Sequence, residues 1–230
     1  GLGAGMAAAS LADALGGRVR LLGSPAEEGG GGKVFMIERG ALDGVDAAMM
    51  VHPADVDLQW MTTIANQQIE VVYHGRSAHA AAAPWLGRNA LDAAVLGYMN
   101  VAALRQHIRP EERLHGIFTD GGDKPNIVPS RAAMHWYVRS ATLESLQPLK
   151  ARVLAALAAG AEATGCEMEH RWIDPPYADL RTNAPLCDLF TQNAARLGRT
   201  VAAPEADTDV VGSTDMGNVS YVVPSIHPMI

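Results

Sequence analysis

The order of strand and helix patterns in the middle of the chain constrains the fold most strongly. Four short apolar segments bounded by turn residues alternate with two long segments of helical spacing. The expected strands cover 69–75, 114–120, 132–140 and 166–173, and the expected helices cover 84–107 and 143–164. A βαββαβ order of this kind is typical of a ferredoxin-like unit.

The flanking segments have the pattern of a separate α/β domain. Helical and short continuous apolar segments alternate there, as in a sheet covered by helices. We expect helices at 3–15, 33–39 and 183–197, strands at 18–22 and 47–51, and an apolar segment at 219–223. The sequence therefore predicts one α/β domain formed by residues 1–65 and 178–230, interrupted by an inserted domain at 66–177.

Composition excludes several classes of function. The net charge of −7 and the absence of a basic run argue against binding to nucleic acid. Two cysteines, Cys166 and Cys187, make a disulfide framework improbable and favour a reducing, cytoplasmic compartment. No segment approaches the roughly 20 apolar residues that span a bilayer, so we expect no membrane contact.

Two adjacent carboxylates, Glu27 and Glu28, follow a predicted strand and precede four glycines. Neighbouring side chains of an extended segment point to opposite sides, so one carboxylate can bind a metal while the other acts as a general base. His52 follows the next predicted strand and is a candidate metal ligand. The alternatives are a charged pair near a helix N-terminus and a hydrogen-bonded histidine at a strand end.

Five motifs occur in order along the chain: Gly-Ser-Pro-Ala-Glu27-Glu-Gly-Gly-Gly-Gly, Val-His52-Pro, Gly-Arg-Ser-Ala-His79-Ala, Pro-Asn126-Ile-Val-Pro and Gly-Ser-Thr-Asp215-Met-Gly-Asn. Together they resemble the M20 metallopeptidase/amidohydrolase family. The likeness is greatest to its branch of aminobenzoyl-glutamate hydrolases and Xaa-Arg or β-alanyl-lysine dipeptidases.

The resemblance implies a zinc-peptidase-like catalytic domain with a two-metal site that holds Zn²⁺, or Mn²⁺ as the alternative. Glu27 matches the general base that takes a proton from the attacking water. Glu28 matches a ligand of one metal, and His52 matches a ligand of the other. An ordinary charged pair remains the alternative for the two glutamates.

The resemblance also implies that the inserted domain is a lid through which two copies form a homodimer. His79 matches the lid histidine that polarises the scissile carbonyl, usually across the dimer. Asn126 and Arg139, thirteen residues apart, match the pair that holds the substrate carboxylate. An ordinary loop histidine and a solvated arginine on an open sheet face are the alternatives.

The family's remaining ligands lie in a Cys-Gly-His-Asn motif and a later His-Thr, neither of which occurs here. We therefore expect a partial catalytic domain, a piece of a longer protein that is inactive alone. His227 could replace a missing ligand, but it lies upstream of the family's last ligand. Asp209 and Asp215 either cap turns in an acidic loop or line the substrate pocket.

The sequence thus predicts a metal-dependent hydrolase of the amide bond in a small N-acyl amino acid or dipeptide. Substrates of the aminobenzoyl-glutamate type and basic dipeptides both remain open. The alternative is a non-catalytic module in which the inserted domain binds a small anion and forms dimers.

Overall fold

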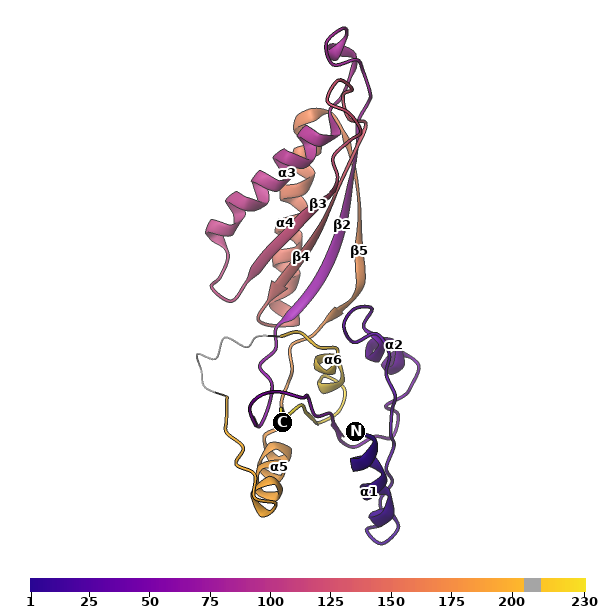
Figure 1. Cartoon of the computed structure of the whole chain (residues 1–230), viewed down its shortest axis with the longest axis vertical. Coiled ribbons are helices and arrows are strands. Elements are labelled where there is room, and N and C mark those ends of the chain that lie inside the picture. The colour runs from indigo at the N-terminus through magenta and orange to yellow at the C-terminus, as the bar shows by residue number, and fades with distance from the viewer. Residues whose placement is uncertain (205–211) are drawn as a thin grey trace. The chain divides into compact units, whose positions relative to one another are not determined.

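A computed structural model describes residues 1–204 and 212–230, and the chain forms two compact units. Unit 1 consists of Gly1–Thr63 together with Ala178–Ile230, and unit 2 consists of Ile64–Tyr177. The chain therefore leaves unit 1 once, forms unit 2 and returns (Figure 1). None of the described helices is long and apolar enough to cross a membrane.

Unit 2 is built on a four-stranded antiparallel sheet with strand order β3-β4-β2-β5. Its strands are β2 (Ala65–His74), β3 (Arg113–Asp120), β4 (Arg131–Ser140) and β5 (Glu167–Tyr177). Its helices are α3 (Ala90–Leu104) and α4 (Leu143–Thr164), with short 3-10 turns at Pro84–Leu86 and Arg105–His107. The order β2, α3, β3, β4, α4, β5 is the βαββαβ order predicted from the sequence.

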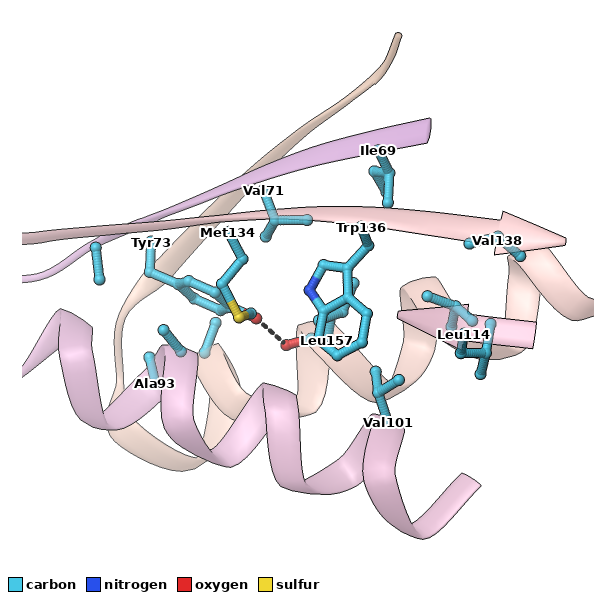
Figure 2. Close-up of a cluster of buried hydrophobic side chains, with 14 of the residues drawn as sticks. Ile69, Val71, Tyr73, Ala93, Val101, Leu114, Met134, Trp136, Val138 and Leu157 are labelled. Carbon is cyan, nitrogen blue, oxygen red and sulfur yellow. Dashed lines mark hydrogen bonds between the residues drawn. The ribbon is translucent and has the colours of Figure 1, made fainter. Parts of the chain in front are cut away.

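The core of unit 2 lies between the sheet and the two helices (Figure 2). Strand β4 shows why the sequence folds this way, because every second side chain from Ala132 to Val138 is buried beneath the helices. Trp136 is the largest fully buried side chain, and the Tyr73 hydroxyl donates a hydrogen bond to the Leu157 carbonyl oxygen at 3.0 Å. The opposite face of β4 carries polar and aromatic side chains instead.

Helices α3 and α4 approach each other closely because glycines stand at their contact. A Cβ atom at Gly160 would overlap the carbonyl oxygen of Ala93 and lie 2.6 Å from the backbone nitrogen of Gly97. The start of α4 is set by Thr142, whose hydroxyl accepts a hydrogen bond from the Ser145 amide. The predicted extent of this helix, residues 143–164, is confirmed.

Unit 1 contains a two-stranded parallel sheet of β1 (Ala48–Met49) and β6 (Ser225–Ile226). Its helices are α1 (Leu2–Ala12), α2 (Gly32–Glu38), α5 (Ala184–Arg196) and α6 (Met216–Ser220). A small apolar core gathers Leu42, Met216, Val219 and Val223. The helix predicted at 183–197 is confirmed as α5, and it begins where the Asn183 side chain accepts a hydrogen bond from the Leu186 amide.

One strand predicted for unit 1, at residues 18–22, is wrong. Residues 18–22 form no strand, and the side chains of Val19, Leu21 and Leu22 are exposed. An apolar segment becomes a strand only when a neighbouring strand pairs with its backbone, and no described strand pairs with this one. The apolar segment 219–223 begins within α6, and Val219 and Val223 face the small core.

Candidate active site

The loop that carries Glu27 and Glu28 turns sharply into α2. Gly30 and Gly31 have φ values of 97° and 62°, which favour glycine, and a Cβ at Gly32 would overlap the Pro25 carbonyl oxygen. Three of the four glycines are therefore needed for the backbone to fold back on itself. Glu27 is half-buried in this turn, whereas Glu28 is exposed.

A buried ion pair anchors the end of this loop. The ammonium group of Lys33 lies 2.6 Å from one carboxylate oxygen of Asp215, and the Lys33 backbone amide donates to the other oxygen at 2.9 Å. Asp215 is fully buried and Lys33 is 8% exposed. The carboxylate also satisfies one of the amides that the first turn of a helix leaves unpaired. Asp215 thus ties its own motif to the carboxylate loop rather than lying in an acidic turn.

His52 and His227 approach each other where β1 and β6 continue beyond their regular pairing. The His52 amide donates to the Pro228 carbonyl oxygen at 2.9 Å, so the two histidines lie on neighbouring parallel segments. Their ring centroids are 5.7 Å apart and the rings are nearly perpendicular, at 83°. His52 is exposed at the end of its segment, and His227 is fully buried.

Backbone carbonyl groups determine which nitrogen of each ring is free to bind a ligand. Nδ1 of His52 lies 2.8 Å from the Pro53 carbonyl oxygen, and Nδ1 of His227 lies 2.8 Å from the Met50 carbonyl oxygen. A carbonyl oxygen only accepts, so Nδ1 carries the hydrogen in both rings and Nε2 carries the lone pair. This is the tautomer of an imidazole that binds a metal through Nε2.

Burial lowers the pKa of His227 most strongly, and the charges of His52 and Lys33 lower it further. The Met50 carbonyl and the Glu27 carboxylate oppose this shift of the pKa. Glu27 is therefore close enough to His227 to act on it electrostatically, although the two residues are 200 positions apart. Within unit 1, Glu27 and His52 thus lie near enough to His227 for their charges to affect its pKa.

The described imidazole and carboxylate groups of unit 1 could supply some of the ligands of a metal centre, but not a complete set. The Nε2 atom of His227 is buried, and nothing in the described part of the chain bonds to it. Oriented imidazole nitrogens with carboxylates nearby are the donors that Zn²⁺ prefers. Within residues 1–204 and 212–230, however, no three His, Cys, Asp or Glu side chains are grouped closely enough to hold a metal ion. Asp209 lies outside the described residues.

In unit 2, His79 and Asn126 lie side by side in two paired loops. His79 forms an antiparallel bridge with Ile127, and the Ala80 amide donates to the Asn126 carbonyl oxygen at 3.0 Å. The Nδ1 atom of His79 accepts hydrogen bonds from the amides of Ala81 and Ala82, at 3.2 and 3.1 Å. In the neutral ring Nε2 therefore carries the hydrogen, which is the tautomer that can donate to an oxyanion. Both side chains are exposed.

Arg139 lies elsewhere on unit 2, on the polar face of the sheet. Its guanidinium group stands over the Tyr137 ring at 5.4 Å, and the His115 ring stacks on the same tyrosine at 5.6 Å. Burial lowers the pKa of His115 first, and the positive charges of Arg139 and Arg105 lower it further. Arg139 thus lies against aromatic rings of Tyr137 and His115, and its planar guanidinium group suits a carboxylate.

The register of β4 separates Arg139 from Asn126. Arg139 pairs with Asn66 on one side and Arg113 on the other, whereas Asn126 belongs to the loop beyond the opposite end of β3 and β4. Ala133, near that loop, lies six residues before Arg139, which corresponds to roughly 20 Å along a strand. In one copy of the chain, Asn126 therefore lies with His79, and neither lies beside Arg139.

A family model for peptidase family M20/M25/M40 matches residues 1–229. The chain belongs to the M20 peptidase family. Mouse Xaa-Arg dipeptidase is 42% identical over 212 residues, which are 92% of this chain and 49% of the dipeptidase. The chain thus spans about half the length of this relative, and the family predicted from the five motifs is confirmed.

Solved structures of M20 proteins share the fold of this chain. The aminobenzoyl-glutamate utilization protein of Klebsiella pneumoniae matches with a TM-score of 0.75 and 24% identity, over 90% of this chain and 55% of that one. The YXEP protein of Bacillus subtilis, described as a dinuclear metal-binding peptidase of the M20 family, matches with a TM-score of 0.64 and 20% identity. That match covers 90% of this chain and 53% of the other. An α/β fold of the M20 type is thereby established.

Sequence reasoning assigned no role to Lys33, and it left the roles of Asp215 and His227 open between alternatives. One signal for His227 was present, because His52 and His227 are both followed by proline after an apolar segment. Two such segments in an α/β protein are candidates for neighbouring parallel strands, whose carboxyl ends meet at one edge. Lys33 gave no comparable signal, since a lysine in the first turn of a helix usually points to solvent.

Proposed function

We propose that this M20 protein is a metal-dependent hydrolase of the amide bond in a small N-acyl amino acid or dipeptide. Its main support is that Glu27 and His52, the residues that match the family's base and ligand, lie on separate segments and both act on the charge of His227. The similarity to mouse Xaa-Arg dipeptidase over 92% of the chain supports the amide-hydrolase class.

Glu28 and His52 are the residues of this chain that would hold the metal ions, Zn²⁺ or alternatively Mn²⁺. A bound divalent ion supplies Lewis-acid chemistry, since it polarises a carbonyl group and makes water more acidic. Glu28 is exposed at the turn and His52 is exposed at the end of its segment, so both are accessible to a ligand. The Pro53 carbonyl holds His52 in the tautomer with a free Nε2 lone pair.

Glu27 is the general base of the proposed reaction. It is the less exposed of the two adjacent carboxylates and lies in a turn whose following helix is anchored by the Lys33–Asp215 pair. A carboxylate held in this way takes a proton from the attacking water and delivers it to the leaving amine. Loss of such a proton relay typically lowers the rate by about 10²–10⁴-fold.

Unit 2 supplies the groups that recognise the substrate. His79, with its hydrogen on Nε2, donates to the developing oxyanion, and Asn126 next to it assists in positioning the substrate. Arg139 binds the substrate carboxylate through its planar guanidinium group. Since Asn126 and Arg139 lie far apart in one copy, we propose that a homodimer completes each site with His79 and Asn126 of the partner subunit.

A kinetic panel with the full natural protein tests the proposal. Its substrates are dipeptides with a C-terminal arginine or lysine, together with p-aminobenzoyl-glutamate. Glu27→Ala is expected to lower kcat by at least about 10²-fold with an unchanged metal content. Glu38→Ala, at an exposed position on the same loop–helix segment, serves as the matched control and is expected to keep full activity. Near-normal turnover by Glu27→Ala would show that Glu27 is not the base.

The panel also separates the enzyme from the non-catalytic alternative. A protein that binds these compounds without any turnover, in the presence of Zn²⁺ or Mn²⁺, would support a small-anion-binding module. Turnover of one substrate class identifies the specificity within the M20 family.

A further inference from the structure

His227 is the most unusual polar residue of unit 1. Its side chain is fully buried, yet its Nε2 atom has no hydrogen-bond partner among the described residues. Leaving a buried acceptor unsatisfied is unfavourable, because the atom loses the hydrogen bond that it would make to water. Buried polar atoms nearly always have a partner, which can be a water molecule or an ion, so Nε2 of His227 is an atom that a ligand would satisfy.

The orientation of the ring is determined by its other nitrogen. Nδ1 donates to the Met50 carbonyl oxygen at 2.8 Å, which leaves the Nε2 lone pair as the free donor atom. Met50 lies just before the His52-Pro segment, so the same stretch of backbone orients both imidazole rings. Each ring therefore presents a lone pair rather than a hydrogen.

The geometry of the two rings fits ligation of one ion. With a Zn–N distance of about 2.0–2.1 Å, two imidazoles on a single metal have their centroids roughly 5–6 Å apart. The observed distance between the centroids of His52 and His227 is 5.7 Å. The ring planes are nearly perpendicular, at 83°, so the two histidines are not stacked on each other.

The charged groups near His227 are consistent with a cation beside it. Glu27 and His52 act on its electrostatics, as does Lys33. The positive charge of Lys33 is compensated by its ion pair with the buried Asp215 at 2.6 Å. Glu27 is a negative group that acts on His227, and a negative charge near the ring favours a divalent ion there.

We propose that Nε2 of His227 is a ligand of the same metal ion as His52, beyond the ligand set that the family resemblance implies. This inference is conditional on the proposed metal-dependent function. Metal binding by Nε2 would also explain why His227 is buried with this nitrogen unpaired among the described residues.

The test uses the full natural protein and the variant His227→Asn. The asparagine Nδ2 group can still donate to the Met50 carbonyl, whereas the Nε2 lone pair is lost. Zn²⁺ affinity is measured by competition with a chelator, and Co²⁺ is used for visible absorption spectra. We expect His227→Asn to bind Zn²⁺ at least about 100-fold more weakly, and the Co²⁺ d–d bands to move, because a nitrogen leaves the ligand field.

His170→Asn, at an exposed position on β5, is the control for losing a histidine in general. It is expected to match the unsubstituted protein in both measurements. Unchanged Co²⁺ bands in His227→Asn would overturn the assignment, whatever the affinity. If the variant does not fold, the unsubstituted protein still decides, because bound Co²⁺ must shift the NMR signal of the His227 Nδ1 hydrogen strongly. An unshifted signal overturns the proposal.

His52→Ala separates this inference from the proposed function. If the natural protein binds metal and turns over substrate, and His52→Ala loses the metal while His227→Asn retains it, only the assignment of His227 fails. If the natural protein binds no divalent metal, both the proposed function and the assignment of His227 fail.

Discussion

Removal of the Asp215 carboxylate should destabilise unit 1 strongly. Asp215 is fully buried and Lys33 is 8% exposed, so Asp215→Ala leaves an ammonium group buried without its counter-charge. Breaking a buried ion pair by removing one partner costs about 3–5 kcal/mol. This corresponds to a decrease of about 10²–10⁴-fold in the ratio of folded to unfolded molecules, and to a fall in Tm of roughly 6–20 °C.

Equilibrium unfolding in urea measures the cost, with hydrogen exchange of peptides from α2 reporting on unit 1 separately. Lys33→Met combined with Asp215→Asn removes both charges but keeps an oxygen for the Lys33 backbone amide, and should stay within about 1 kcal/mol of the parent. Asp188→Ala, at an exposed position on α5, should change stability by less than about 0.5 kcal/mol. A cost below about 1 kcal/mol for Asp215→Ala would refute the reasoning, since the pair would then not be buried.

Three further predictions concern unit 2. Gly160→Ala should lower stability by about 1–3 kcal/mol in thermal unfolding, because the new methyl group overlaps the backbone of α3. Helix propensity alone would instead stabilise the protein by about 1 kcal/mol, and that result would contradict the prediction. Tyr73→Phe removes the hydrogen bond to the Leu157 carbonyl and should cost about 1 kcal/mol in urea unfolding, whereas a neutral effect would show that the bond contributes nothing. Asn126→Ala and Arg139→Ala should each be inactive on their own. When the two variants are mixed and exchange subunits at random, half of the dimers are mixed and each has one intact site, so about a quarter of the activity should return. No recovery would exclude a site shared between subunits.

The fold of unit 2 was predictable because its signals are local. In β4, alternate residues from Ala132 to Val138 are apolar and buried, and Thr142 marks the start of α4 within the sequence. Residues 18–22 were predicted wrongly for the opposite reason. Their apolar character is that of a strand, but strand formation depends on a partner segment that the local sequence does not specify.

The candidate site was predictable only in part. The adjacent carboxylates and His52 could be identified from their positions after apolar segments, and Arg139 and Asn126 from their motifs. That Asn126 lies with His79 and away from Arg139 follows from strand register, which spacing along the chain does not reveal. His227 contacts Met50, and Asp215 contacts Lys33; in each pair the two residues lie more than 175 positions apart in the sequence. Only the fold brings the partners together.

Metal reconstitution of the full natural protein tests the central claim most directly. After removal of divalent ions by a chelator, turnover of the preferred dipeptide or aminobenzoyl-glutamate substrate is measured while Zn²⁺ or Mn²⁺ is returned in known equivalents. The account predicts that turnover is lost on stripping and rises with the metal bound. Glu27→Ala should bind the same equivalents without turnover, and His52→Ala should bind fewer. Turnover that persists in the stripped protein, or that survives in Glu27→Ala, would contradict the proposal that Glu27 and a metal at His52 hydrolyse the amide bond.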